Sequence, residues 1–372
     1  MKENRNKMAN VPNLRFRGFE EEWEEARLGD NCDISMCKRI FANETHEIEE
    51  IPFYKIGTLG SKPDSFITRE LFEEYKNKYN YPKLGEVMIT CSGTVGKCIV
   101  FNGENSYYQD SNIVWINNPT LKINNELLYY LLSNINWNIL NSTTITRIYS
   151  ADLKNLTLKY PKNHKEQDKI VSLLSQIDDR LSTQIQIIKE LGTLIKGLIR
   201  SFIRKEVMNI QLKNCLNCHS STLMESAVIE KKGTYPVYGA TGIIAYTPSY
   251  EIDKESILII KDGASVGKVQ YAKDKYSVIG TLNYLTPKEN VSLKYFYYYL
   301  QTFNFEKYKV GSGIPHIYFK NYGDEYIYCP PIETQTKIAN FLSAIAEKLE
   351  TEKQLLKKYT EQKKYLLANM FI

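Results

Sequence analysis

The chain has 372 residues, which is enough for two or three domains with substantial hydrophobic cores. Its 48 Lys and Arg against 43 Asp and Glu give a net charge of +5, which permits a nucleic-acid partner but does not require one. The N-terminus is polar and no run of about 18 apolar residues occurs, so we expect a cytoplasmic protein without a membrane partner. Its seven cysteines are then expected to be mostly reduced thiols.

A polar lead-in and a first globular unit open the chain. Residues 1–27 are polar and end in an acidic cluster, and the globular unit spans 28–159. Short β-branched or aromatic runs alternate there with Gly, Asn and Pro, which predicts strands and turns. One helical pattern, 125–139, interrupts them. The runs expected to form strands are 51–56, 87–90, 98–101 and 112–116.

The helical region 160–207 follows, and within it residues 167–203 predict one long helix. Apolar residues recur at steps that alternate four and three, with one polar interruption at Gln184. A seam of this period lets a long helix pack against another one. Its roughly 37 residues, without proline, would form a rod of about 55 Å. The seam consists of Ile170, Leu174, Ile177, Leu181, Gln184, Ile188, Leu191, Ile195, Leu198 and Phe202.

The second globular unit, 208–327, repeats the plan of the first. Similar short runs, Gly-rich turns and an aromatic helical segment recur in the same order. The second unit is shorter by about 13 residues between the first run and the Gly-rich turn. The matched segments are 52–54 with 236–238, 87–97 with 258–268, 127–131 with 296–300, and 147–149 with 316–318.

The helical region 328–372 repeats the earlier one. Adding 168 to each seam position gives a second seam in which eight of ten residues are apolar, with Glu352 in place of Gln184. A polar seam residue costs stability and fixes the register of two helices. Lys363 stands where the first seam has Ile195, and it should weaken that end of the pairing unless its long stem lies along the groove. The second seam consists of Ile338, Leu342, Ile345, Leu349, Glu352, Leu356, Tyr359, Lys363, Leu366 and Met370.

The order of globular unit, rod, globular unit and rod indicates a tandem duplication. We expect a mixed α/β (α+β) fold in which the two rods form an antiparallel coiled coil, related by a pseudo-twofold axis, with one globular unit at each end. Such a molecule presents two similar surfaces at a separation set by rod length. Duplex DNA, whose grooves recur about every 34 Å, suits it as a target. Because the loops of the two units differ, they should read two different short sequences.

The chain resembles the specificity subunit of a type I restriction-modification enzyme, in which two target recognition domains alternate with two conserved helical regions. The resemblance is carried by residues 12–16 with Gly18, Phe19 and Trp23, by the paired Val-Gly-Lys turns, and by the Pro, Gln and Lys-Ile residues before each long helix. It implies that each recognition domain reads one half of a split double-stranded DNA site. It also implies that the helical regions dock two modification (methyltransferase) subunits, to which restriction (helicase-nuclease) subunits add.

The resemblance further implies a non-catalytic chain without a cofactor of its own, because S-adenosylmethionine, Mg and ATP would belong to partner subunits. The residues agree with this. The Gly-rich turns lack the spacing of a phosphate-binding loop, and Cys98 or Val269 follows the lysine instead of Ser or Thr. The segment 215–219 has the spacing of a haem attachment site, which would require export, and zinc would need a second cysteine pair. The segment 329–332 lacks the residues of an adenine methyltransferase loop, so no catalytic or metal-binding group is expected.

Side chains that could contact DNA lie in predicted loops of both units. Arg, Lys, Asn, Gln and small hydroxyl side chains can read base edges, while Lys, Ser, Thr and Tyr can bind phosphates. Arg147 and His316 are the strongest candidates, since each follows a polar turn just before the strand that leads into a rod. The first unit supplies Lys38, Arg39, Lys55, Thr58, Thr94, Lys97, Gln109, Ser111, Asn112, Thr144, Thr146 and Arg147. The second supplies Lys231, Lys232, Tyr238, Thr241, Lys261, Ser265, Lys268, Asn283, Ser312 and His316.

Among the apolar residues of the first rod that lie outside its seam, we select five that a seam alone would not require. We expect them to form docking ground for modification subunits. They are Leu173, Ile187, Leu194, Ile199 and Ile203. A second function stays open: the modest net charge also fits a coiled-coil adaptor that pairs two protein ligands without binding DNA.

Overall fold

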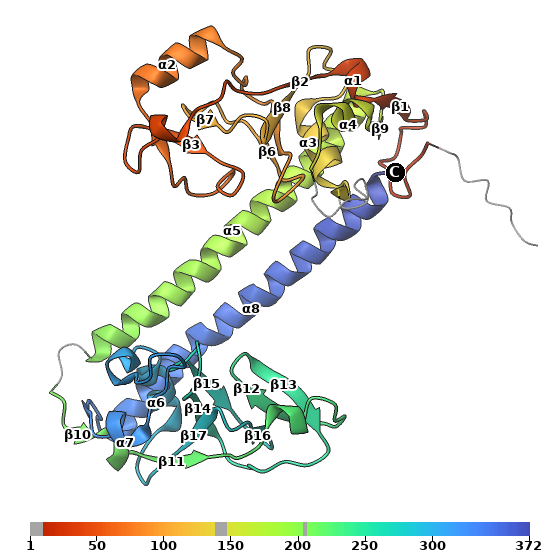
Figure 1. Ribbon diagram of the computed structural model, residues 1–372. Helices are drawn as coiled ribbons and strands as arrows, with labels where there is room; N and C mark the ends of the chain where they lie inside the picture. The colour runs from red at the N-terminus through yellow and green to blue at the C-terminus, as the bar shows by residue number, and fades with distance from the viewer. Residues whose placement is uncertain (1–9, 138–146, 204–206) are drawn as a thin grey trace, which may run out of the picture. The chain divides into compact units, whose positions relative to one another are not determined.

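The computed structural model describes most of the chain, namely residues 10–137, 147–203 and 207–372. The chain forms two compact units, one comprising the residues up to 182 together with 357–372, and the other comprising 183–356. Each unit has its own sheets and core. Each also contains part of both long helices, α5 (His164–Ile203) and α8 (Ile332–Met370) (Figure 1).

Three sheets build the globular part of the first unit. Its strands are β1 (Glu24–Arg27), β2 (Asp33–Ser35), β3 (Ile51–Tyr54), β4 (Phe66–Ile67), β5 (Val87–Thr90), β6 (Cys98–Val100), β7 (Tyr107–Tyr108), β8 (Ile113–Asn117) and β9 (Thr157–Tyr160). Its short helices are α1 (Leu28–Asn31), η1 (Ala42–Glu44), α2 (Arg69–Lys78), α3 (Asn125–Ser133) and α4 (Ser150–Asn155). The central strand β5 is buried along its whole length. Val87 and Ile89 face one hydrophobic cluster and Met88 faces another, as the alternation of a strand requires.

The second unit has the same construction. Its strands are β10 (Ile210–Gln211), β11 (Leu216–Ser220), β12 (Tyr235–Gly239), β13 (Gly242–Thr247), β14 (Ser256–Ile260), β15 (Val269–Ala272), β16 (Ser277–Val278), β17 (Leu282–Pro287) and β18 (Tyr326–Ile327). Its short helices are η3 (Leu212–Asn214), η4 (Glu225–Ala227), α6 (Leu293–Leu300), η5 (Phe305–Tyr308) and α7 (Phe319–Tyr322). Along buried β14, Ile257 and Ile259 face one cluster, while Leu258 and Ile260 face the other.

The two globular parts share one topology. The four-stranded sheets run β2-β8-β5-β6 and β11-β17-β14-β15, and the three-stranded sheets run β4-β3-β7 and β13-β12-β16. In both three-stranded sheets one pair is parallel, β3 with β7 and β12 with β16. A two-stranded sheet, β1 with β9 or β10 with β18, lies before each long helix in the chain. The predicted tandem duplication and mixed fold are confirmed.

Helix α2 accounts for most of the length difference between the units, and the sequence did not predict it. It has ten residues and lies in the interval that is about 13 residues shorter in the second unit. Only Phe72 of this helix is buried, so its pattern lacks an apolar stripe. The helix begins at an N-cap, where the Thr68 hydroxyl accepts a hydrogen bond from the Leu71 amide.

Helix α3 ends at Ser133, six residues before the predicted end of that helix. The chain turns back there because the indole of Trp137 donates to the Leu132 carbonyl at 3.2 Å. Its ring then covers Gly96, whose φ is +81° and whose added Cβ would lie 2.0 Å from the ring. Glycine is required at this position both by the backbone angle and by the aromatic neighbour.

The two long helices begin three residues earlier than predicted, α5 at His164 instead of 167 and α8 at Ile332 instead of 335. At the start of α5 the Asn163 side chain accepts a hydrogen bond from the Lys165 amide at 2.9 Å, which is N-cap geometry. Before α8, the carbonyl of Pro331 accepts from the amides of Thr334 and Gln335. These caps lie outside the apolar repeat, so the repeat alone underestimates the length of each helix.

Gln167 and Gln335 join the long helices to the globular parts in the same way. The Oε1 atom of Gln167 accepts from the Asn124 amide at 2.7 Å, and that of Gln335 accepts from the Ser292 amide at 2.8 Å. Asn124 and Ser292 are the N-caps of α3 and α6. The Nε2 atom of each glutamine donates to a proline carbonyl before its helix, at 2.9 and 2.7 Å. These contacts align α3 with α6 at a spacing of 168, one residue less than the predicted alignment.

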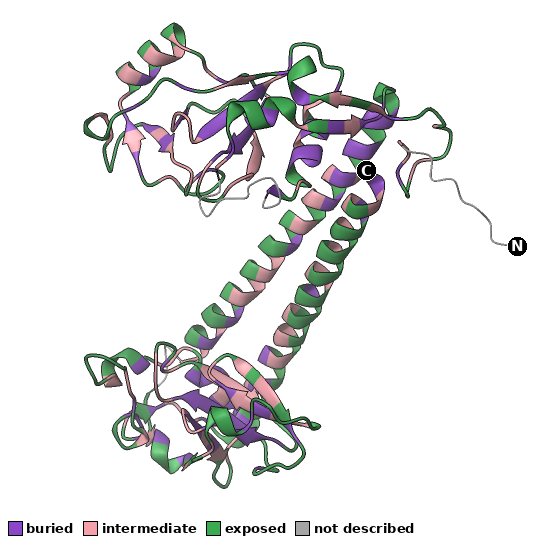
Figure 2. Ribbon diagram, turned by 45° about the vertical axis from the view of Figure 1, so that its right-hand side comes forward, coloured by how far each residue is buried: buried purple, intermediate pink, exposed green. Residues whose placement is uncertain are grey.

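Within each unit the portions of α5 and α8 lie side by side and antiparallel (Figures 1 and 2). All twenty predicted seam residues are buried or half-buried. In the second unit the amide of Gln184 donates to the backbone carbonyl of Glu352 at 3.1 Å and also to its carboxylate. The two polar positions that the repeat equates therefore contact each other.

Lys363 does not weaken the seam in the way that the sequence suggested. Its ammonium forms an ion pair with Asp178, whose carboxylate also accepts from the Tyr130 hydroxyl at 2.9 Å. The same ammonium lies 5.7 Å from the centre of the Tyr130 ring. The positions that correspond to these three residues in the other unit are apolar or aromatic and share one hydrophobic cluster: Ile195, Ala346 and Tyr298.

The segment after residue 10 fastens both helices in the first unit. Arg15 binds the buried Glu166 of α5 with two hydrogen bonds of 2.7 and 2.8 Å, which raise the pKa of the guanidinium. The Leu14 amide donates to the Asn369 carbonyl of α8 at 2.8 Å. Among the resemblance residues of the N-terminus, Trp23 lies in the core of this unit and Phe16 packs against it.

Candidate nucleic-acid interface

Four loops meet in the first unit and bring together most of its predicted DNA-contacting residues. The Oε1 atom of Gln109 accepts from the Ile56 amide at 3.3 Å, and Ser92 donates to the Asn112 side chain at 2.6 Å. Ser92 is also paired through the backbone with Arg147. These contacts link the loops 55–61, 91–97, 109–112 and 147–149. Arg39 reaches the same group through Asp110, at 2.9 Å.

The equivalent loops meet in the second unit. The Ile279 amide donates to the Tyr238 carbonyl at 3.1 Å, as the Gln109 amide does to Tyr54 in the first unit. The Gly263 amide donates to the carbonyl of Pro315 at 3.0 Å. The predicted residues that these contacts bring together are Tyr238, Thr241, Lys261, Ser265, Lys268, Ser312 and His316.

The side chains in these loops differ in how much of their hydrogen-bonding capacity is already used. Thr58 closes its own turn on Lys55, and the Lys97 ammonium donates to the Leu59 carbonyl. Lys55 itself pairs with Asp64 at 2.9 Å. Ser111 is half-buried at a φ of +54°, and Lys38 is exposed over the ring of Tyr79. The exposed predicted residues of the Gly-rich and neighbouring turns are Thr94, Thr241, Ser265, Lys268 and Ser312.

Arg147 and His316 occupy equivalent positions, each paired through the backbone with the residue two places after a central strand. The Nε atom of Arg147 is buried without a hydrogen-bond partner among the described residues, and its guanidinium lies 5.6 Å from the centre of the Tyr149 ring. His316 Nδ1 lies 2.6 Å from Asp262 Oδ1. A short helix, α4 or α7, separates each residue from the strand that the sequence predicted to follow directly.

Several predicted contact residues lie in strands, away from the loop clusters or outside the described residues. Asn283 is buried in strand β17, where its side chain accepts from Ser220 at 2.9 Å, so it is not a loop residue. Tyr238 lies in β12 with its ring edge-on to Tyr276, and burial raises the pKa of its hydroxyl. Lys231 and Lys232 precede β12, at the end of its hairpin away from the Thr241 turn. Thr144 and Thr146 lie outside the described residues.

The predicted docking ground on α5 is smaller than expected. Ile199 is buried in the second unit's own core, and Ile203 and Leu173 pack against the cores of their units. Leu194 is 48% exposed, and Ile187 is half-buried. Ile185, which the sequence analysis did not select, is 56% exposed.

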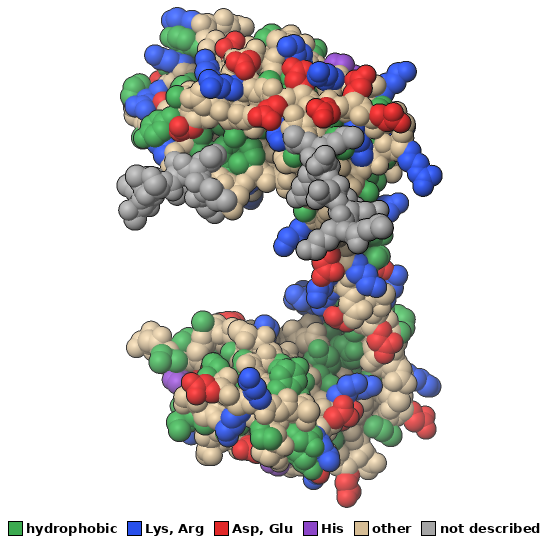
Figure 3. Space-filling model, turned by 90° about the vertical axis from the view of Figure 1, so that its right-hand side faces the viewer, with side chains coloured by type: hydrophobic (Ala, Val, Ile, Leu, Met, Phe, Trp, Pro, Cys, Tyr) green, Lys and Arg blue, Asp and Glu red, His purple; other side chains and the backbone are tan. Residues whose placement is uncertain are grey.

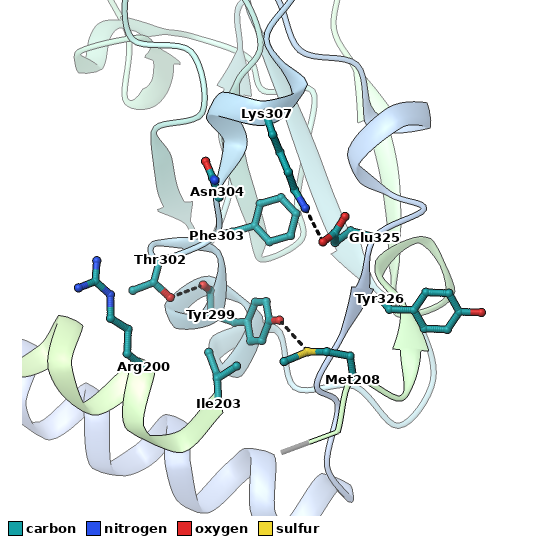
Figure 4. A pocket seen from close by; sticks show the side chains of 10 residues that line it. All are labelled: Arg200, Ile203, Met208, Tyr299, Thr302, Phe303, Asn304, Lys307, Glu325 and Tyr326. Carbon is teal, nitrogen blue, oxygen red and sulfur yellow. Dashed lines mark hydrogen bonds and ion pairs between the residues drawn. The ribbon is translucent and has the colours of Figure 1, made fainter. Parts of the chain in front are cut away.

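The second unit contains a pocket of about 600 Å³ between the end of α5, α6 and η5 (Figure 4). At its edge Lys307 pairs with Glu325 at 2.5 Å, and this ion pair holds the pKa of the Glu325 carboxyl below its usual value. The Tyr299 hydroxyl donates to Met208 Sδ at 3.9 Å. The described residues that line the pocket include no histidine, cysteine or serine. Elsewhere in the described part of the chain, too, no group of His, Cys, Asp and Glu residues could hold a metal ion.

The distribution of charge and the hydropathy of the helices are the remaining features of the described residues. On the face shown in Figure 3, Lys and Arg side chains are interspersed with Asp and Glu, without a continuous basic area. Among the described residues, no helix combines the length and apolar character that a membrane span needs.

The fold defines a class of protein with two related α/β domains, each followed in the chain by a long helix. The profile of the type I restriction modification DNA specificity domain matches the chain twice, over residues 20–192 and 204–360. The chain belongs to this family, which confirms the resemblance seen in the sequence. Curated proteins that this chain matches are named specificity subunits of type I restriction enzymes.

Curated relatives support the same assignment. The chain is 49% identical over 151 residues to a type I restriction enzyme specificity subunit of Haemophilus influenzae, covering 41% of this chain and 39% of the relative. It is 27% identical over 254 residues to a type I specificity subunit of Mycoplasma genitalium, covering 62% of this chain and 65% of the relative. The chain thus spans less than two thirds of the length of these relatives.

Solved structures share the fold. The crystal structure of the type I restriction-modification S subunit from M. genitalium matches with a TM-score of 0.69 at 20% identity, covering 97% of this chain and 99% of that one. A chain from a structure that describes complex assembly and conformational transition of the type I restriction-modification system matches with a TM-score of 0.56 at 14% identity, covering 94% and 97%. At these identities the similarity shows the fold alone.

Proposed function

We propose that this chain recognises a bipartite double-stranded DNA target, with one half-site read by each globular unit. The observation that carries the proposal is the duplication of the loop cluster. Both units bring the same loops together on the same strands, yet Ser92 and Arg147 in one unit correspond to Asp262 and His316 in the other. A shared framework with different side chains suits recognition of two different short sequences.

Phosphate and base contacts would come from different parts of each cluster. Thr94 and Lys97, with Ser265 and Lys268, lie in the Gly-rich turns, where short side chains and backbone amides can approach phosphates. Arg147 and His316 are the proposed base readers, because each is fixed through its backbone and keeps part of its side chain accessible. Arg and His side chains can form hydrogen bonds with base edges.

We further propose that the helical regions dock two methyltransferase subunits and that restriction subunits add to this core. S-adenosylmethionine, Mg and ATP would then be bound by the partners. The support is family membership, together with the exposed apolar residues Ile185 and Leu194 on α5, which the helix pair leaves uncovered. Partner docking would bury them.

The test is duplex DNA binding by the chain in complex with its methyltransferase subunit, measured over a range of salt concentrations. Phosphate contacts release counterions, so the logarithm of the binding constant should fall steeply and linearly with the logarithm of salt concentration. A complex that forms but binds no DNA at low salt would instead indicate a coiled-coil adaptor.

A further inference from the structure

Equivalent backbone bridges in the two units hold different pairs of side chains. Ser92 pairs with Arg147 after β5, and Asp262 pairs with His316 after β14. Ser92 donates its hydroxyl hydrogen to the Asn112 side chain at 2.6 Å. In the second unit the corresponding residue, Asp262, contacts the histidine ring directly. The two bridges therefore present different hydrogen-bonding groups from the same place in the fold.

His316 is held firmly by its backbone. Its amide donates to the Val310 carbonyl at 2.8 Å, and its carbonyl accepts from the Val310 amide at 2.9 Å. The next residue, Ile317, is buried and donates its amide to the Lys261 carbonyl at 2.9 Å. With the backbone fixed on both sides, the orientation of the ring is set mainly by its contact with Asp262.

That contact determines which ring nitrogen carries the proton. His316 Nδ1 lies 2.6 Å from Asp262 Oδ1, and an ionised carboxylate can only accept a hydrogen bond, so Nδ1 donates. In a neutral imidazole the other nitrogen, Nε2, is then an acceptor. The imidazole is 37% exposed and its aspartate partner 30% exposed, so the ring is still accessible to a ligand.

We propose that Asp262 is a positioning residue that makes His316 an obligate acceptor, so that His316 Nε2 accepts a hydrogen bond from a base amino group in the second half-site. The bases that offer an amino group at the major-groove edge are adenine, through N6, and cytosine, through N4. Arg147 offers only donors, and it suits an acceptor edge such as that of guanine. This inference rests on the proposed DNA recognition and names the base class for one residue in each unit.

The experiment is selection from randomised duplexes at pH 8, with the full chain in complex with its methyltransferase subunit. The wild-type chain should prefer adenine or cytosine at one position of the second half-site. His316→Arg should shift that position to guanine by about tenfold or more, because it recreates the donor arrangement of the first unit. The first half-site should not change.

Asp262 is tested separately from the ring. Asp262→Asn can either donate or accept, so discrimination at the same position should fall several-fold while overall affinity changes little. Asp262→Glu should restore part of the discrimination, which a role in stability alone would not explain. Ser92→Ala is the matched control in the first unit, and it should leave the second half-site unchanged.

The outcomes separate the two levels of the proposal. A His316→Arg variant that binds DNA with unaltered base preference would overturn the role of His316. The recognition function would survive that result. Failure of the wild-type complex to bind any duplex in a salt-dependent way would overturn both.

Discussion

At the scale of single residues, buried polar side chains fasten the globular parts to the helices. Gln167 and Gln335 have 0% and 1% of their surface exposed. Gln167 also donates to the Lys122 carbonyl at 2.7 Å, so its amide satisfies three backbone groups. A buried backbone group that loses its partner keeps its full desolvation cost.

Gln167→Ala should lower the free energy of unfolding of the first unit by about 2–3 kcal/mol, because buried backbone groups lose their partners. Tryptophan fluorescence in urea reports this unit selectively, since Trp23, Trp115 and Trp137 all lie in it. Gln176→Ala, at an exposed position of the same helix, should change the value by less than about 0.5 kcal/mol. Equal effects of the two substitutions would show that the buried amide has no special role.

Arg147→Ala should weaken binding at the first half-site by about 1–3 kcal/mol, or relax base preference there, because a base-reading arginine would be lost. Titration with duplexes altered in one half-site at a time measures this. Lys231→Ala, at an exposed position away from the loop cluster, is the comparison. Unchanged affinity and unchanged site preference for Arg147→Ala would remove it from the interface.

At the scale of elements, the helix pair makes two different kinds of contact at equivalent positions. In the first unit Lys363, Asp178 and Tyr130 form a polar group, while the other unit has a purely hydrophobic contact there. Each arrangement is internally consistent, because an ion pair and an apolar cluster both leave no buried charge alone. A helix pair that combines one residue of the ion pair with one residue of the apolar contact should therefore be less stable than either arrangement.

Lys363→Ile alone should destabilise the first unit, since Asp178 loses its cation. Adding Asp178→Ala supplies the residue types of Ile195 and Ala346 and should recover stability. A double-mutant cycle read by tryptophan fluorescence should give a coupling energy of about 0.5–3 kcal/mol. Strictly additive effects would show that the ion pair does not contribute as a pair.

Glu352 gives the helix pair of the second unit a dependence on pH. Hydrogen bonds from Lys348 and then Gln184 hold the pKa of its carboxyl below the ordinary value of 4.5. A lowered folded-state pKa adds stability above the unfolded-state value, and this stability is lost as pH falls through the folded-state value. The melting temperature should therefore decrease as the pH is lowered below about 4.5, and Glu352→Gln should make this decrease smaller. Glu350→Gln, an exposed neighbour, should follow the wild-type curve; parallel curves for all three proteins would contradict the assignment.

The sequence predicted the elements whose signals are local and periodic. The two seams could be recognised because their apolar residues recur at regular spacings, and the Gly-rich turns because the same short segment occurs twice. Helix α2 was missed because one buried residue makes no pattern, and the end of α3 depends on Trp137 turning back onto Gly96. The partner of His316 lies 54 residues away, so its contact with Asp262 could not be inferred from local spacing. The sequence did contain one signal for this site, because Ser92 and Asp262 each lie two residues after a central strand.

At the scale of the whole molecule, duplication supplies two recognition units from one plan. Each unit has the same strand order, the same glutamine contact to a long helix and the same meeting of loops, but different side chains at its proposed reading positions. Selection can then alter one loop cluster while the framework and the other cluster stay the same. Specificity should accordingly be modular, with one half-site assigned to each unit.

The most direct measurement of this claim is base-resolved adenine methylation in cells that contain the chain and its methyltransferase subunit. It should be made for the natural chain and for a chain whose residues 208–327 are exchanged for the equivalent domain of a related specificity subunit. We predict a split target in the first case and, after the exchange, a change in one half-site with the other half-site retained. A continuous target, or an exchange that alters both halves together, would contradict the account.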